Sequence, residues 1–216
     1  MSVKKLALLL TATVAAGCSA AYAATLSVGS WHLWAGSQTL TKGTCTLTGT
    51  AQTVDTYVDE RNPTSSFGGT TTMLVGPRTS QRKWALIRFD LTSCNIPSTG
   101  GADSATLSVR ITTAPGSSRT IDVTPVSTTW DGTLTWNVAQ LLTQGATTAS
   151  FATGTTSNVT KTVTVTADVD DQIKTGGIFG WVLEDNGASS NITTTLGSSN
   201  NGTAANRPTL TINYEK

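Results

Sequence analysis

Alternating apolar and polar residues mark the clearest predicted strand, at residues 104–112. Ala105, Leu107, Val109 and Ile111 face one side, and the residues between them are Ser, Thr or Arg. A period of two is typical of a strand with one buried face. The same arithmetic groups apolar residues in two further segments: Ala85, Ile87, Phe89 and Leu91, and Leu210, Ile212 and Tyr214.

Shorter strands are expected wherever Gly, Pro, Asn and Ser clusters separate apolar runs, at the spacing of a β-sandwich. These segments are residues 120–127, 162–166, 178–184 and 192–197. Residues 178–183 are apolar on both faces and should lie centrally in a sheet. One short helix is predicted over residues 167–175, with Asp168 capping its first turn and Gly176 ending it. The fold class is therefore all-β, an antiparallel β-sandwich with at most one short helix.

Two segments lack strand periodicity. Residues 143–161 form a long polar connection, which we interpret as a mobile loop. Residues 24–50 are rich in Thr, Ser and Gly and are treated as a leader. Its Trp31 and Trp34 could be exposed for binding, or they could seal one end of the sandwich.

The N-terminus has the layout of a secretory signal, with Lys4 and Lys5, an apolar core at residues 6–16 and a small-residue cleavage site at residues 21–23. We expect export after cleavage, and no transmembrane segment, because the apolar core is too short to cross a bilayer. Lipidation of Cys18 is the alternative fate of this region. The predicted division is a signal peptide at 1–23, the leader at 24–50 and one domain at 51–216.

Composition narrows the choice of function. About a fifth of the residues are Thr, and 12% are charged, which suits exposed strand faces. Without Lys4 and Lys5 the basic residues number one fewer than the 13 acidic residues. No basic excess remains, so nucleic acid is not an expected partner.

Cys45 and Cys94 remain after the signal is removed, and in an oxidising compartment they are expected to form a disulfide. Two buried free thiols are the alternative.

An ordered series of short motifs resembles the DNRLRE-type domains, also classed as carbohydrate-binding module family 96. The segments that carry the resemblance are Asp55–Asp59, Asn62–Pro63, Phe67–Gly68, Leu74–Gly76, Leu86–Leu91, Ile96–Pro97, Ser104–Leu107, Trp130, Thr135–Asn137, Gly180–Asp185 and Arg207–Ile212. The resemblance implies a jelly-roll-type sandwich that binds acidic or neutral polysaccharides outside the cell. Family members usually have a Ser followed by a basic residue and Glu before the last strand, where this chain has Ser198-Ser199-Asn200.

Sugar recognition needs aromatic faces for stacking and, for acidic sugars, cationic side chains that meet carboxylates. The predicted ligand surface combines one aromatic residue with the nearby basic residues: Trp84, Arg88, Arg82, Lys83 and Arg78. The alternative is a solvated edge with Trp84 packed under a neighbouring loop. Trp130 and Trp136 are expected to pack in the core or close a loop, and Trp181 is expected to be in the core.

Catalysis is not expected, since the chain has a single histidine and no evident carboxylate pair on facing strands. Zinc lacks ligands. A structural calcium ion is a further expectation to test, because loop aspartates suffice to hold one. The candidate ligands are Asp168, Asp170, Asp171, Asp55 and Asp59.

Three hypotheses follow. The first is a secreted, non-catalytic protein that binds extracellular polysaccharide. The second is a self-assembling subunit of a cell surface, matrix or filament, with the leader as a partner-binding strand. The third, a polysaccharide lyase or hydrolase, is disfavoured by the residue inventory.

Overall fold

The computed structural model describes residues 27–28, 31–32, 41–79, 81–188 and 192–215. The chain divides into two units, Met1–Thr39 and Leu40–Lys216. In the first unit, β1 (Ser27–Val28) and β2 (Trp31–His32) form an antiparallel pair. The predicted signal peptide, Cys18 and Trp34 lie outside the described residues.

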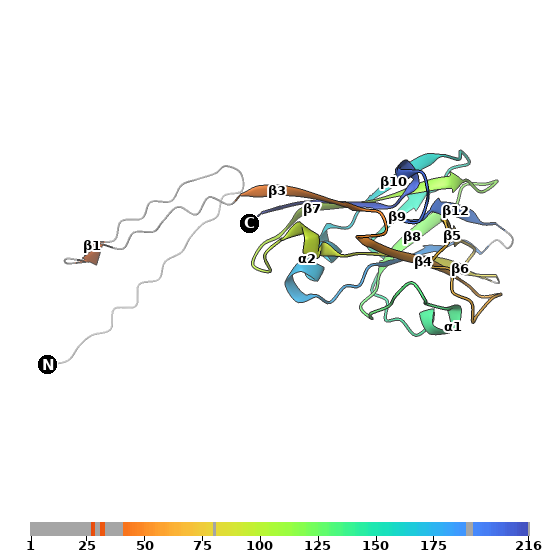
Figure 1. The fold of residues 1–216 in the computed structure, drawn as a ribbon, viewed down its shortest axis with the longest axis horizontal. Coiled ribbons are helices and arrows are strands. Elements are labelled where there is room, and N and C mark those ends of the chain that lie inside the picture. Colours follow the sequence, from red (N-terminus) through yellow and green to blue (C-terminus); the bar gives the residue numbers. More distant parts are fainter. Residues whose placement is uncertain (1–26, 29–30, 33–40, 80, 189–191, 216) are drawn as a thin grey trace. The chain divides into compact units, whose positions relative to one another are not determined.

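The second unit is a sandwich of two antiparallel sheets (Figure 1). The six-stranded sheet has the order β3-β13-β7-β12-β5. The sixth strand, β10, pairs with β7 along the edge opposite β13. Its strands are β3 (Lys42–Thr48), β5 (Thr72–Val75), β7 (Gly101–Thr113), β10 (Val159–Thr164), β12 (Thr194–Gly197) and β13 (Thr209–Glu215). The five-stranded sheet has the order β4-β6-β11-β8-β9. Its strands are β4 (Thr53–Asp59), β6 (Lys83–Phe89), β8 (Thr120–Pro125), β9 (Ala149–Ala152) and β11 (Trp181–Asp185). The predicted fold class is confirmed.

The space between the sheets holds the inner core, and the predicted alternation accounts for it. The apolar sets of β7, β6 and β13 all point into this core and are buried. The corresponding residues are Ala105, Leu107, Val109 and Ile111, then Ala85, Ile87 and Phe89, then Leu210, Ile212 and Tyr214. A period of two therefore selected the correct face in each of these strands.

A second buried cluster, the outer core, lies on the other side of the five-stranded sheet. It is closed by the segment from Val126 to Leu142, which includes the short helix α1 (Trp136–Ala139) (Figure 1). Its buried members are Val58, Trp84, Leu86, Val126, Trp130, Leu134, Trp136, Ala139, Leu142 and Val182. The five-stranded sheet is thus apolar on both faces, and β11 at its centre shows both: Trp181 and Leu183 enter the inner core, and Val182 enters the outer core.

The predicted helix is present as α2 (Thr166–Thr175), ended by Gly176 with a φ of 68°. Left-handed backbone of this kind is the usual place for glycine after a helix. Asp168 does not cap the helix. Its carboxylate instead accepts bonds from the Thr148 hydroxyl (2.8 and 3.0 Å) and the Trp181 indole N–H (2.7 Å). The structure adds helix α1 and two short 3-10 turns, η1 (Leu91–Cys94) and η2 (Ala204–Asn206).

Two sequence expectations differ from the structure. Residues 143–161, interpreted as a mobile loop, contain β9 and the start of β10. The end of the expected leader, from Lys42, is β3. All three are outer strands that bury few side chains, so their polar sequences carried little periodic signal.

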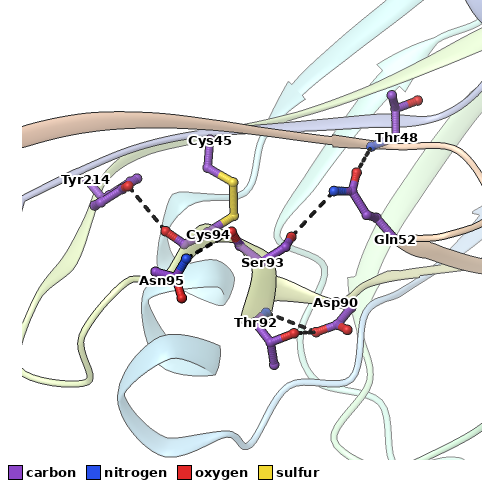
Figure 2. Close-up of a disulfide and its surroundings, with 9 residues drawn as sticks. All are labelled: Cys45, Thr48, Gln52, Asp90, Thr92, Ser93, Cys94, Asn95 and Tyr214. Carbon is purple, nitrogen blue, oxygen red and sulfur yellow. Dashed lines mark hydrogen bonds between the residues drawn. A yellow bond between two sulfur atoms is a disulfide. The ribbon is translucent and has the colours of Figure 1, made fainter.

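The disulfide joins Cys45 of β3 to Cys94 of η1, as predicted (Figure 2). Next to it, the Tyr214 hydroxyl donates to the Cys94 carbonyl at 3.3 Å. Because η1 follows β6, the disulfide links the edge of the six-stranded sheet to the end of a strand in the five-stranded sheet.

Candidate functional site

A groove with a volume of about 590 Å³ opens at the end of the sandwich where β6 stops. The segments around it are far apart in sequence: the β3–β4 turn, the end of β6, η1, the end of α2 and the approach to β11. We call it the Arg88 groove. Its lining includes Gln52, Thr53, Val54, Arg88, Ile178 and Phe179.

Arg88 supplies the charge in this groove. It is half-buried, lies opposite Val54 across the β4–β6 pair, and holds its guanidinium 5.7 Å from the centre of the Trp130 ring. This cation–π contact orients the side chain without neutralising it. Arg88 forms no ion pair within the described part of the chain.

Two aspartates near Arg88 are held by other donors. Asp90 caps η1, where the Thr92 hydroxyl (2.7 Å) and backbone N–H (2.9 Å) donate to its carboxylate and lower its pKa (Figure 2). Asp131 is bonded in the same way to Thr133, which lowers its pKa. Arg88 makes a smaller electrostatic contribution to both pKa values. Its guanidinium N–H groups therefore remain available to a ligand.

Thr53 also lines the groove, but the residue is 4% exposed and its buried hydroxyl oxygen has no hydrogen-bond partner among the described residues. Because Thr53 pairs with the inward-facing Phe89, this hydroxyl lies on the face of β4 opposite Val54 and is closed to a ligand in the groove. Beside it, Gln52 fixes the turn by accepting from the Thr48 N–H and donating to Ser93 (Figure 2).

Apolar side chains form the remaining wall of the groove. Val54, Ile178 and Phe179 are half-buried there. The position of Phe179 is fixed by its backbone, because its carbonyl accepts from the Trp130 indole N–H (2.7 Å) and its N–H donates to Val126 (2.6 Å). A cation, hydroxyl and amide groups and an aromatic wall are the components of a sugar-binding site.

The structure separates the predicted basic cluster. Lys83 and Arg88 lie at opposite ends of β6, about 17 Å apart along the strand. At the Lys83 end, each cation has an acidic partner: Lys83 pairs with Asp59 (3.4 Å). Arg82 pairs with Glu60 (2.9 Å), and Arg78 pairs with Asp122 (3.4 Å) and Glu184 (3.5 Å).

Trp84 lies in the outer core, where it is 8% exposed and its ring centre is 4.7 Å from that of Trp136. Arg82 covers the other ring of this pair, 4.8 Å from its centre. The alternative that the sequence left open, Trp84 packed under a neighbouring loop, is what the structure has. Trp130, Trp136 and Trp181 are buried, as predicted.

The aspartates named for calcium bind protein donors. Asp59 forms an ion pair with Lys83 and accepts hydrogen bonds from the Asn62 amide and the Arg61 N–H. Asp170 forms an ion pair with Lys174, and Asp171 accepts a hydrogen bond from the Thr175 hydroxyl. Within the described ranges, no group of three or more His, Cys, Asp or Glu side chains is placed to hold a metal ion.

Asp55 is the hydrogen-bond partner of Ser199 in the Ser198-Ser199-Asn200 segment, where the family usually has a basic residue and Glu. It is 3% exposed, and its carboxylate accepts from the Ser199 N–H (2.6 Å) and hydroxyl (3.2 Å). Burial raises its pKa to about 6, and the Ser199 bonds partly oppose that rise. Ser199 thus joins β4 of one sheet to the end of β12 in the other.

Sequence reasoning selected Arg88 but missed Gln52, Thr53 and Phe179. Phe179 lies in an apolar run that indicates only burial, Gln52 lies in the turn between β3 and β4, and Thr53 is the first residue of β4. No spacing in the sequence brings these residues together, because the groove forms only when the sheets stack.

The comparisons with known proteins agree with the fold. Comparison with curated proteins gives no match. The sequence model of carbohydrate-binding module family 96 matches residues 46–214, from within β3 to within β13. This match spans most of the 216 residues and includes all or part of every strand of the sandwich, so the chain belongs to carbohydrate-binding module family 96.

Proposed function

We propose that this is a secreted, non-catalytic protein that binds an extracellular polysaccharide in the Arg88 groove. The observation that supports the proposal is that one groove is lined by a guanidinium with no ion pair among the described residues and by a half-buried phenyl ring. Arg88 would pair with a sugar carboxylate, Gln52 would bond to sugar hydroxyls, and Phe179 would contact a ring face.

Secretion is supported by the charged end, apolar core and small-residue site of the N-terminus together with the disulfide. None of the described helices is long and apolar enough to cross a membrane.

The test is titration calorimetry of the purified protein with alginate, pectate and neutral glucans. Arg88→Gln should lower the affinity for the acidic polymers about tenfold, because a hydrogen bond between charged groups is lost. Phe179→Ala should weaken binding several-fold, as expected for a lost ring contact. Arg61→Gln is the matched control, because Arg61 is exposed and lies outside the groove. An equal loss in the control would show that only net charge matters.

The second candidate is a subunit of an extracellular assembly. It is favoured by the position of β3, an edge strand that forms the end of the Trp-bearing leader in sequence. Failure to bind any polymer, with assemblies that grow with concentration in light scattering, would favour this candidate over the first.

A further inference from the structure

A second pocket lies on the outer face of the six-stranded sheet, on the opposite layer from the outer core. It has a volume of about 270 Å³ and is lined by Arg110 and Arg207 together with the hydroxyl residues Ser108, Thr160 and Thr209. The remaining lining residues are Val and Ala, so no acidic side chain lines it among the residues the structure describes.

Strand register explains why both arginines are there. Ser108 of β7 pairs with Thr209 of β13, and the strands are antiparallel. Arg110 lies two residues after Ser108, and Arg207 lies two residues before Thr209 with extended backbone (φ −78°, ψ 146°). Both side chains therefore rise from the same end of the same face, as residues opposite each other in a ladder do.

The two guanidiniums lack acidic partners. Arg110 donates to the Thr160 hydroxyl at 3.2 Å, and Arg207 donates to the Asn201 carbonyl at 2.8 Å. The buried Nε of Arg110 has no hydrogen-bond partner among the residues that the structure describes. Neither arginine forms an ion pair with any residue in the described ranges. Two like charges in neighbouring positions disfavour the fold, and a bound anion would remove that cost.

We infer that this pocket binds a tetrahedral oxyanion, either sulfate or phosphate, free or as an ester on a polymer. The pocket offers several N–H and O–H donors, among them Arg110 of β7, Thr160 of β10 and Thr209 of β13. Sulfate and phosphate carry three or four acceptor oxygens for such a set of donors, whereas a carboxylate carries two. The volume is sufficient for such a group and several waters. The pocket uses none of the residues of the Arg88 groove, so the inference is independent of the proposed function.

The pocket also lies at the end of an uncharged surface. Next to it, Thr48, Thr209, Ser108 and Thr162 form one cross-strand row of outward side chains. The following row is Thr46, Thr211, Thr106 and Thr164. We call these rows the hydroxyl face. An ester on a polymer would therefore have hydroxyl groups beside it and no competing carboxylate in either row.

The test follows the side-chain Nε–H signals of arginine by NMR while sodium sulfate or phosphate replaces sodium chloride at constant ionic strength. The signals of Arg110 and Arg207 should shift saturably, and acetate should bind more weakly. Arg110→Gln should lower the sulfate affinity about tenfold. Arg61→Gln and Arg88→Gln should leave it unchanged, which separates this pocket from exposed charge and from the groove.

Titration with dextran sulfate and plain dextran then distinguishes the sources. Binding of dextran sulfate that depends on Arg110 identifies an ester, and binding of inorganic sulfate alone identifies the free ion. Arg207→Lys serves as a second variant that keeps the charge and loses the planar donor fork. The inference is overturned if no saturable shift occurs at Arg110, if Arg61→Gln has the same effect, or if acetate binds as tightly as sulfate.

Discussion

The outer face of the five-stranded sheet is covered and the outer face of the six-stranded sheet is exposed, although the strands of both sheets alternate. On the five-stranded sheet, the outward residues of β6 include Trp84 and Leu86, and they are buried in the outer core. On the six-stranded sheet, the outward residues of β7 include Thr106 and Ser108, and they stay partly exposed on the hydroxyl face. The comparison shows that alternation assigns a residue to a face, whereas the chemistry of that face decides whether another segment covers it.

The largest effect is expected from a substitution in the segment that covers the five-stranded sheet. Trp136→Ala should lower the free energy of unfolding by about 3 to 5 kcal/mol, because it leaves a cavity against Trp84 and removes the ring beneath Arg82. Urea denaturation measures the change.

Thr106→Ala is the matched substitution on the hydroxyl face and should change the free energy of unfolding by no more than about 0.5 kcal/mol. A similar loss in both variants would mean that the two outer faces contribute equally, and the contrast between them would fail.

The next test concerns the covalent link between the two sheets. Replacing both Cys45 and Cys94 by Ala should cost about 3 to 4 kcal/mol, because the disulfide restricts a long loop in the unfolded chain. The urea midpoint of this double variant measures the cost. A loss below about 1 kcal/mol would show that contacts alone hold β3 to the rest of the sandwich.

A smaller effect is expected from the polar link between the sheets, Asp55 with Ser199. Because the folded-state pKa of Asp55 is raised to about 6, its contribution to stability is complete below the pKa of the unfolded chain. The contribution is lost as the pH rises through about 6, and the free energy of unfolding should fall by about 2 to 3 kcal/mol.

Asp55→Asn keeps an oxygen that can accept from Ser199 and carries no charge, so it should abolish this fall. Urea denaturation at a series of pH values measures the slope. Asp103→Asn, an exposed change on the six-stranded sheet, should keep the slope of the unaltered protein. If Asp55→Asn keeps that slope too, another group is responsible for it.

The residues of the inner core could be predicted from the sequence, whereas the outer strands of the sheets could not. Ala105 to Ile111 and Ala85 to Phe89 gave the inner core because each strand buries a regular set of side chains. Strands β3 and β9 were missed, and β10 was expected to begin only at residue 162, because outer strands rich in Thr need no such set.

The candidate site was predictable only in Arg88, and the reason is physical. Its other members come from turns and strand ends whose approach depends on how the sheets stack. Trp84 is the opposite case, a residue predicted to bind the ligand that the structure buries. An outward tryptophan is a fair candidate for sugar stacking, but the segment that buries it begins more than forty residues later in the chain.

The disulfide has a mechanical consequence. The start of β3 and the end of β13 lie side by side, since Lys42 pairs with Glu215, so a load between the two ends of the sandwich would unzip this pair first. Unzipping reaches Cys45, opposite Ile212, after a few residues. From there the load passes through the sulfur atoms to Cys94, and the residues between the two cysteines are never stretched. About 160 Å of chain is thereby withheld from extension, which makes this end of the molecule suited to bear tension.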